Sequence, residues 1–72
     1  MNHWWTGYSP AQAAAELPGL YEERRFLAID MAECLEYRQH RAAQDVARAQ
    51  EELAEVIGEL EALAAQEVEV AA

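Results

Sequence analysis

Apolar residues recur at helical spacing along most of the chain, from Leu20 to Ala65. At about 100° per residue they fall within one arc of roughly 160° on a helical wheel, and the phase is the same at both ends. From Val46 onward the spacing alternates between three and four residues, as in the seam of a coiled coil. The pattern predicts an all-α protein built on one long amphipathic helix over residues 20–65, or on two helices that share a face. The stripe comprises Leu20, Leu27, Met31, Cys34, Leu35, Ala42, Val46, Ala49, Leu53, Val56, Leu60 and Leu63.

The polar segment 37–41, YRQHR, decides between one helix and two. Arg38 and Gln39 interrupt the stripe there. The segment contains no glycine, proline, asparagine or serine, however, and a turn between helices normally contains at least one of these. We therefore favour an unbroken helix roughly 70 Å long. A helical hairpin that turns near residues 37–42 is the alternative.

A short helix is predicted over residues 9–17. Ser9 suits the N-cap, Pro10 can occupy the first helical position, and Gln12 completes a capping box. Pro18 disfavours helical geometry in the residue before it, so the helix is expected to end there. A turn made by this proline and the glycine after it then leads into the main helix.

The two ends of the chain differ in character. Residues 1–8, MNHWWTGY, are rich in aromatic side chains, and disordered segments are depleted in them. We expect this aromatic leader to dock on the chain's own helix and, with the short helix, to cover Phe26, Ile29 and Tyr37. An exposed aromatic hot spot for another protein is the alternative. Residues 66–72 are expected to fray, because two glutamates oppose the negative end of the helix dipole.

Charge and size narrow the class of protein. The 72 residues form a single small domain, 1–72, with a net charge of −9 and no lysine. Direct binding to nucleic acid or to anionic lipid is not expected, because both would be repelled. The single cysteine, Cys34, excludes an intrachain disulfide and is typical of a reduced, cytoplasmic setting. The sequence shows neither a membrane-spanning stretch nor a signal peptide.

The stripe also predicts self-association, because a long rod cannot bury it against the short N-terminal helix alone. Residues 49–72 contain seven glutamates and no basic residue, whereas all five arginines precede them. We therefore expect an antiparallel helical homodimer, in which each acidic half lies beside the arginine-bearing half of the other copy. Its interface is predicted to comprise Leu27, Met31, Leu35, Ala42, Val46, Ala49, Leu53, Val56, Leu60 and Leu63.

The sequence contains no catalytic set, phosphate-binding loop or zinc spacing, so neither an enzyme nor a cofactor is expected. Small acidic helical chains of this type resemble phage-encoded inhibitors, antitoxin-like regulators and assembly adaptors, although no motif carries that likeness. The expected function is to bind another protein, with a basic surface, and to modulate it. The alternatives are a nucleic-acid mimic in a basic groove and a structural coiled-coil module. The residues expected to bind the partner are Trp4, Trp5, Tyr37, Arg38, Arg41, Glu51, Glu52, Glu55 and Glu59.

Overall fold

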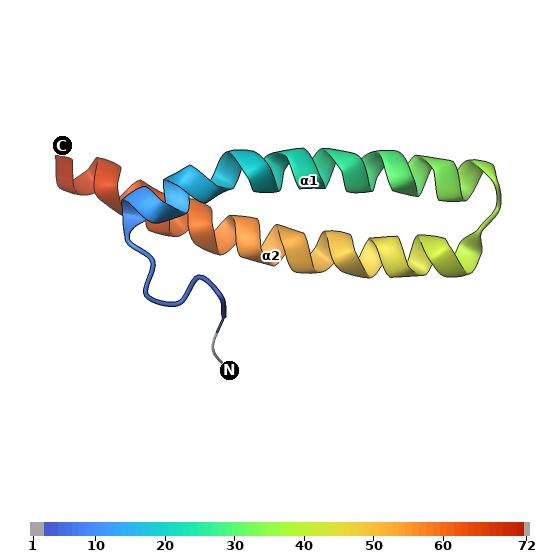
Figure 1. The fold of residues 1–72 in the computed structure, drawn as a ribbon, viewed down its shortest axis with the longest axis horizontal. Coiled ribbons are helices and arrows are strands. Elements are labelled where there is room, and N and C mark those ends of the chain that lie inside the picture. The colour runs from blue at the N-terminus through green and yellow to red at the C-terminus, as the bar shows by residue number, and fades with distance from the viewer. Residues whose placement is uncertain (1–2, 72) are drawn as a thin grey trace.

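The computed structural model describes the backbone of residues 3–71 and the side chains of residues 3–66; Met1, Asn2 and Ala72, the outermost parts of the predicted leader and tail, lie outside the described residues. Within this range the chain forms two helices, α1 (Pro10–Glu36) and α2 (His40–Ala71). The helices run antiparallel and side by side, so the two ends of the chain lie toward the same end of the hairpin (Figure 1). The predicted all-α class is confirmed.

The beginning of α1 follows the predicted capping chemistry. The side chain of Ser9 accepts a hydrogen bond from the backbone N–H of Gln12 at 3.2 Å. In return, the Gln12 side-chain oxygen accepts one from the backbone N–H of Ser9 at 2.8 Å. Pro10 occupies the first position of the helix. The predicted capping box is therefore confirmed, and it satisfies N–H groups that a helix N-terminus otherwise leaves without partners.

The predicted end of this helix at Leu17 and the predicted Pro-Gly turn are corrected, because Pro18 and Gly19 both lie inside α1. A proline within a helix removes one backbone hydrogen bond and crowds the preceding turn, but it does not have to end the helix. Leu17 and Leu20, on either side of the pair, both pack into the contact with α2. This packing holds the chain helical across the proline. In Figure 1 the first turns of α1 run at an angle to the rest of the helix.

The turn between the helices corrects the expectation of an unbroken rod and matches the hairpin alternative. Arg38 has a φ of 56°, in the left-handed region. The N–H of Gln39 donates to the carbonyl of Cys34 at 2.8 Å, and the N–H of Arg38 donates to that of Leu35 at 3.3 Å. These two bonds form a Schellman motif, which usually has glycine at the left-handed position. The turn could not be recognised from the sequence, because an arginine occupies the position at which a glycine normally marks the end of a helix.

The strain at this position gives a first testable prediction. A side chain other than that of glycine costs about 1–2 kcal/mol in the left-handed conformation. Arg38→Gly and Arg38→Ala remove the same charge, but only the glycine relieves the strain. We expect Arg38→Gly to be more stable than Arg38→Ala by about 1 kcal/mol in chemical denaturation. Equal stability of the two variants would show that the turn does not hold residue 38 in this conformation.

The core lies toward the end of the hairpin that carries the chain termini. It combines two residues of α1 with three of α2, and Leu60 is fully buried. Trp5 and Tyr8 of the leader pack against it, which confirms that the leader docks on its own chain. Near the turn, Cys34 is buried, as predicted for a small core residue. The core cluster consists of Ala13, Leu17, Leu53, Ile57 and Leu60.

Folding into a hairpin changes the role of the predicted stripe. Leu53 and Leu60 pack against α1 of the same chain, so they are buried without a second copy. Ile57, only 2% exposed, was not placed on the stripe. Leu35, which was placed on it, is 58% exposed, although the other stripe residues of α1 are at least partly buried. Of the remaining members Cys34 is buried, and the others are partly buried: Leu20, Leu27, Met31, Ala42, Val46, Ala49, Val56 and Leu63.

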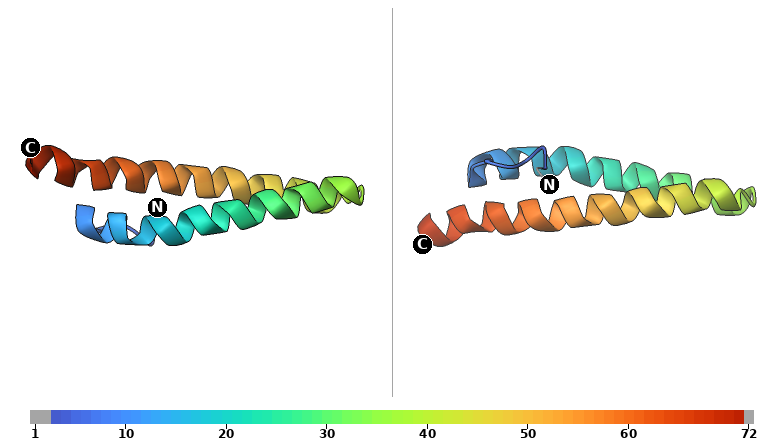
Figure 2. Two further views of the ribbon diagram at one scale, coloured as in Figure 1. Left: turned by 90° about the horizontal axis from the view of Figure 1, so that it is seen from above. Right: turned by 90° about the horizontal axis from the view of Figure 1, so that it is seen from below.

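Two further expectations differ from the structure. The leader and the beginning of α1 do not cover Phe26, Ile29 and Tyr37, which are all exposed. The leader lies toward the end of the hairpin that carries the termini, whereas Tyr37 lies at the turn (Figure 2). The helix α2 also continues through Ala71, beyond the expected start of fraying at Gln66.

Candidate partner-binding surface

The leader, α1 and α2 together enclose a small groove. Its volume is about 260 Å³, and its walls are mostly apolar. Leu53 is buried at its base, whereas Glu23 of α1 and Glu52 of α2 are exposed. Groups from three separate parts of the sequence therefore meet at one place, which we call the Trp4 groove. It is lined by Trp4, Leu20, Glu23, Leu27, Ala49, Glu52, Leu53 and Val56.

A compact turn positions the aromatic wall of this groove. The N–H of Thr6 donates to the carbonyl of His3 at 3.0 Å, and Gly7 adopts a φ of 84° that few other residues tolerate. The ring of Trp4 meets that of Trp5 edge-on, with centroids 5.2 Å apart. It meets the ring of Tyr8 in the same way at 5.8 Å. The Trp4 side chain is thus held in place by its neighbours although it is 54% exposed.

The turn of the leader is also braced at its start. The imidazole ring of His3 stacks on the Trp5 ring, with centroids 4.3 Å apart and planes 9° from parallel. The backbone N–H of His3 donates to the hydroxyl of Thr6 at 3.1 Å. Trp5 contributes to the core, so it anchors the leader and leaves the exposed Trp4 to form the groove.

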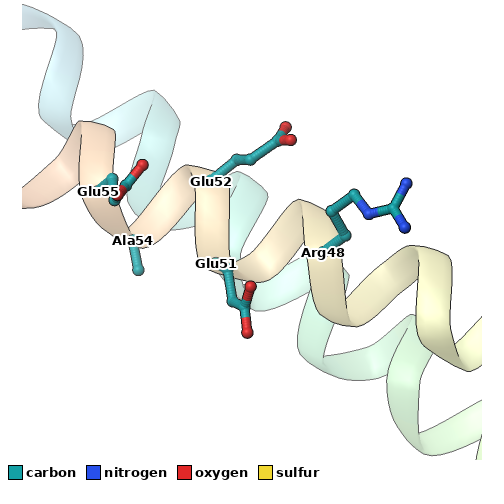
Figure 3. A pocket seen from close by; sticks show the side chains of 5 residues that line it. All are labelled: Arg48, Glu51, Glu52, Ala54 and Glu55. Carbon is teal, nitrogen blue, oxygen red and sulfur yellow. The ribbon is translucent and has the colours of Figure 1, made fainter.

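An acidic hollow lies beside this groove on α2. It is lined by Arg48, Glu51, Glu52, Ala54 and Glu55, and its volume is about 590 Å³. Figure 3 shows the three carboxylates spread along the outside of the helix, with the Arg48 guanidinium near one end. Glu52 lines both this hollow and the Trp4 groove, so the two form one continuous surface.

The predicted partner-binding residues fall into four groups. Trp4 and three of the four acidic residues, Glu51, Glu52 and Glu55, come together on this surface, whereas Glu59 is exposed on α2 but lines neither hollow. Trp5 is used to anchor the leader. The remaining three lie apart, at the turn end of the hairpin: Tyr37, Arg38 and Arg41.

Sequence reasoning did not place Leu20, Glu23 or Leu27 at this surface. Each lies on α1, and its proximity to α2 depends on the pairing of the two helices. The only local signal was that Leu20 and Leu27 belong to the apolar stripe.

A polar link joins the helices beyond the groove. The Tyr21 hydroxyl donates a hydrogen bond to the Glu61 carboxylate at 3.0 Å, and the Arg24 guanidinium carbon lies 4.9 Å from the centre of the Tyr21 ring. The hydrogen bond to Glu61, aided by partial burial and by the negative charge of that carboxylate, raises the pKa of Tyr21 above its usual value, although Arg24 opposes the shift. Arg24 packs on Tyr21 and is not among the residues that line the groove.

The surface combines charged, aromatic and aliphatic side chains. Among the residues that the structure describes, no three His, Cys, Asp or Glu side chains lie close enough together to hold a metal ion. Of the helices in the described part of the chain, none is both long and apolar enough to cross a bilayer. The surface offers carboxylates, a half-exposed indole ring and aliphatic side chains, which suit recognition of a cationic and partly apolar group.

Comparison with protein-family models, with curated proteins and with solved structures gives no match to this chain.

Proposed function

We propose that this chain binds another protein through a basic surface of that protein and modulates its activity, as a small inhibitor or adaptor. The observation that carries the proposal is the continuity of the acidic hollow with the Trp4 groove through Glu52. The carboxylates supply charge that attracts a basic partner, and the indole and leucine side chains supply apolar contact area. Protein interfaces combine these two features.

The apolar groove favours a protein partner over the two alternative functions. A nucleic-acid mimic relies on carboxylates arranged like phosphates and has no use for a half-exposed indole between two helices. A purely structural coiled coil would leave its acidic face as a solvated surface. The net charge of −9 also opposes direct binding to nucleic acid or to an anionic membrane. In this proposal the protein acts in the cytoplasm, where its free cysteine stays reduced.

The experiment is a pull-down from a bacterial lysate with tagged wild-type protein and two triple variants as bait. One variant changes Glu51, Glu52 and Glu55 to glutamine. The control changes three glutamates of α1, Glu22, Glu33 and Glu36, and so alters the net charge by the same amount. We expect the wild type and the control to retain the same partner, the first variant to lose it, and the activity of the partner to change when the wild type is added.

Salt dependence provides the second measurement. Affinity for the partner is expected to fall steeply as salt rises, because the contacts are exposed charge pairs. Equal retention by both triple variants, or affinity that does not change with salt, would contradict the acidic surface as the binding site. If nucleic acid competes with this chain for the same site on the partner, that result would favour the nucleic-acid mimic.

The proposal includes association of two hairpins into an antiparallel homodimer. The hairpin buries the core leucines internally, but it leaves large apolar side chains exposed on one helix and at the turn. Burying them against a second copy would remove them from water. These side chains are Phe26, Ile29, Leu35 and Tyr37, each about half exposed or more.

Sedimentation equilibrium tests this association. We expect a mass of about twice 8.1 kDa at micromolar protein concentration, and unfolding that depends on concentration. Changing both Phe26 and Ile29 to serine should give the monomer mass, whereas Ala54→Ser and Ala62→Ser together, at exposed positions of α2, should leave the dimer intact. A wild-type mass of 8.1 kDa at about 100 µM would rule out the dimer.

A further inference from the structure

The Trp4 groove differs from the acidic hollow in what it can hold. Its volume of about 260 Å³ lies below the roughly 300–1,000 Å³ of pockets that hold drug-sized ligands. It therefore suits one long side chain rather than a whole helix or a small-molecule cofactor. The groove is also walled on three sides by separate elements, the leader, α1 and α2.

The chemistry of the walls varies around the groove. Leucine and valine side chains from both helices form apolar walls, and Leu53 is buried beneath them. Trp4 adds an indole that edge-on contacts with two other rings hold in place. Glu23 and Glu52 approach from opposite helices, and both are exposed. None of the eight residues that line the groove is basic. Arg48 lines the neighbouring hollow.

We propose that the Trp4 groove binds a single arginine side chain from the partner protein, with its methylene groups against the leucines and its guanidinium between Trp4, Glu23 and Glu52. This inference rests on the proposed function and specifies how the partner is recognised. A guanidinium stacks on aromatic faces and donates N–H groups to carboxylates in a fixed planar fork, which matches two carboxylates beside an indole. An uncharged apolar side chain would fill the walls but leave the two carboxylates partly desolvated without a partner.

Arginine also fits better than lysine at this place. The lysine ammonium is a compact and strongly hydrated charge, so its transfer to a partly apolar groove is less favourable. It cannot donate to two carboxylates through a planar fork and at the same time stack on an indole. The neighbouring hollow has no aromatic side chain among its lining residues, so it makes no such distinction between the two cations.

The test uses a synthetic helical peptide of about 18 residues, made of alanine and leucine with arginines on one face, a length at which an isolated helix persists in water. Two control peptides replace the arginines with lysine or with citrulline, which has nearly the same shape as arginine but no charge. Binding is measured by calorimetry with the full chain. The indole N–H resonance of Trp4 is followed by NMR, assigned through its loss in Trp4→Leu.

Matched variants separate the groove from the hollow. Glu23 lines only the groove, and Glu22, its neighbour on α1, lines neither site. We expect Glu23→Gln and Trp4→Leu each to weaken binding of the arginine peptide about five- to tenfold, and Glu22→Gln to change it less than twofold. The citrulline peptide should bind as weakly to the wild type as the arginine peptide binds to Glu23→Gln. Circular dichroism of each variant confirms that the helices are retained.

Two outcomes would overturn the groove proposal. One is equal weakening by Glu23→Gln and Glu22→Gln. The other is an unchanged Trp4 resonance when the arginine peptide binds. If either is accompanied by loss of binding in the Glu51, Glu52 and Glu55 triple variant, the acidic surface is still the binding site and only the groove proposal fails. If the triple variant also binds normally, the proposed function fails with it.

Discussion

Replacing Leu60 with alanine is expected to lower the free energy of unfolding by about 2–5 kcal/mol, the range for leucine-to-alanine changes at buried positions. Leu60 is fully buried, and it lies in a core cluster of five residues. In so small a core the two helices have few other residues with which to fill the cavity. Domains have a total stability of about 5–15 kcal/mol, and the smallest lie at the lower end. The variant should therefore be only marginally stable near room temperature.

The measurement is urea denaturation followed by circular dichroism. Glu59→Gln is the matched control, since this exposed neighbour lines neither hollow and should change stability by less than about 0.5 kcal/mol. Ile57→Ala, at the next most buried large side chain, is expected to behave like Leu60→Ala. If Leu60→Ala and Glu59→Gln were equally stable, the hairpin core would be incorrectly placed.

Replacing Pro18 with alanine is expected to stabilise the protein by about 1–3 kcal/mol. Proline is about 3 kcal/mol less favourable than alanine inside a helix, and part of that difference is offset because proline restricts the unfolded chain. Pro18 is exposed and lies in the interior of α1. The substitution restores a backbone N–H that can donate to the carbonyl of Ala14, and no packed side chain is lost.

Pro10 provides the control for this experiment. It occupies the first position of the same helix, where its missing N–H has no intrahelical partner to lose and its fixed φ is favourable. Pro10→Ala should therefore leave stability unchanged or slightly reduce it. Thermal unfolding of the two variants compares the positions directly. A loss of stability in Pro18→Ala would indicate that the bend of α1 at the proline is needed for its packing on α2.

The parts of the fold that were predictable from sequence depend on neighbouring residues. The capping box needs only Ser9 and Gln12, which are three residues apart, and it formed as expected. The helical character of both halves likewise follows from periodicity. The predictions at Pro18 and Arg38 were wrong because the structure there depends on contacts between residues far apart in the sequence. Contacts with α2 keep the helix intact at the proline, and packing between the helices supports a left-handed arginine, so tertiary structure outweighs local preference at both positions.

The candidate site divides in the same way. Glu55 lies three residues after Glu52 and four after Glu51, spacings that bring side chains together on a helix, so this proximity was visible in the sequence. The Trp4 groove was not visible, because Glu23 and Glu52 meet only when the chain reverses at residues 37–39. Trp4 and Trp5 are adjacent in sequence, and only the packing shows that one anchors the leader while the other stays exposed.

The position of the core at the end that carries the termini affects the order in which the hairpin forms. The Tyr21–Glu61 hydrogen bond spans 40 residues, and the core contacts beside it close loops of similar length. The entropic cost of loop closure opposes such contacts. The short turn at Arg38 has a small entropic cost, but little apolar surface is buried beside it to stabilise an early closed state. Amide hydrogens near the turn can then exchange through local openings that leave the core intact, and those beside Leu60 exchange only when the whole hairpin opens.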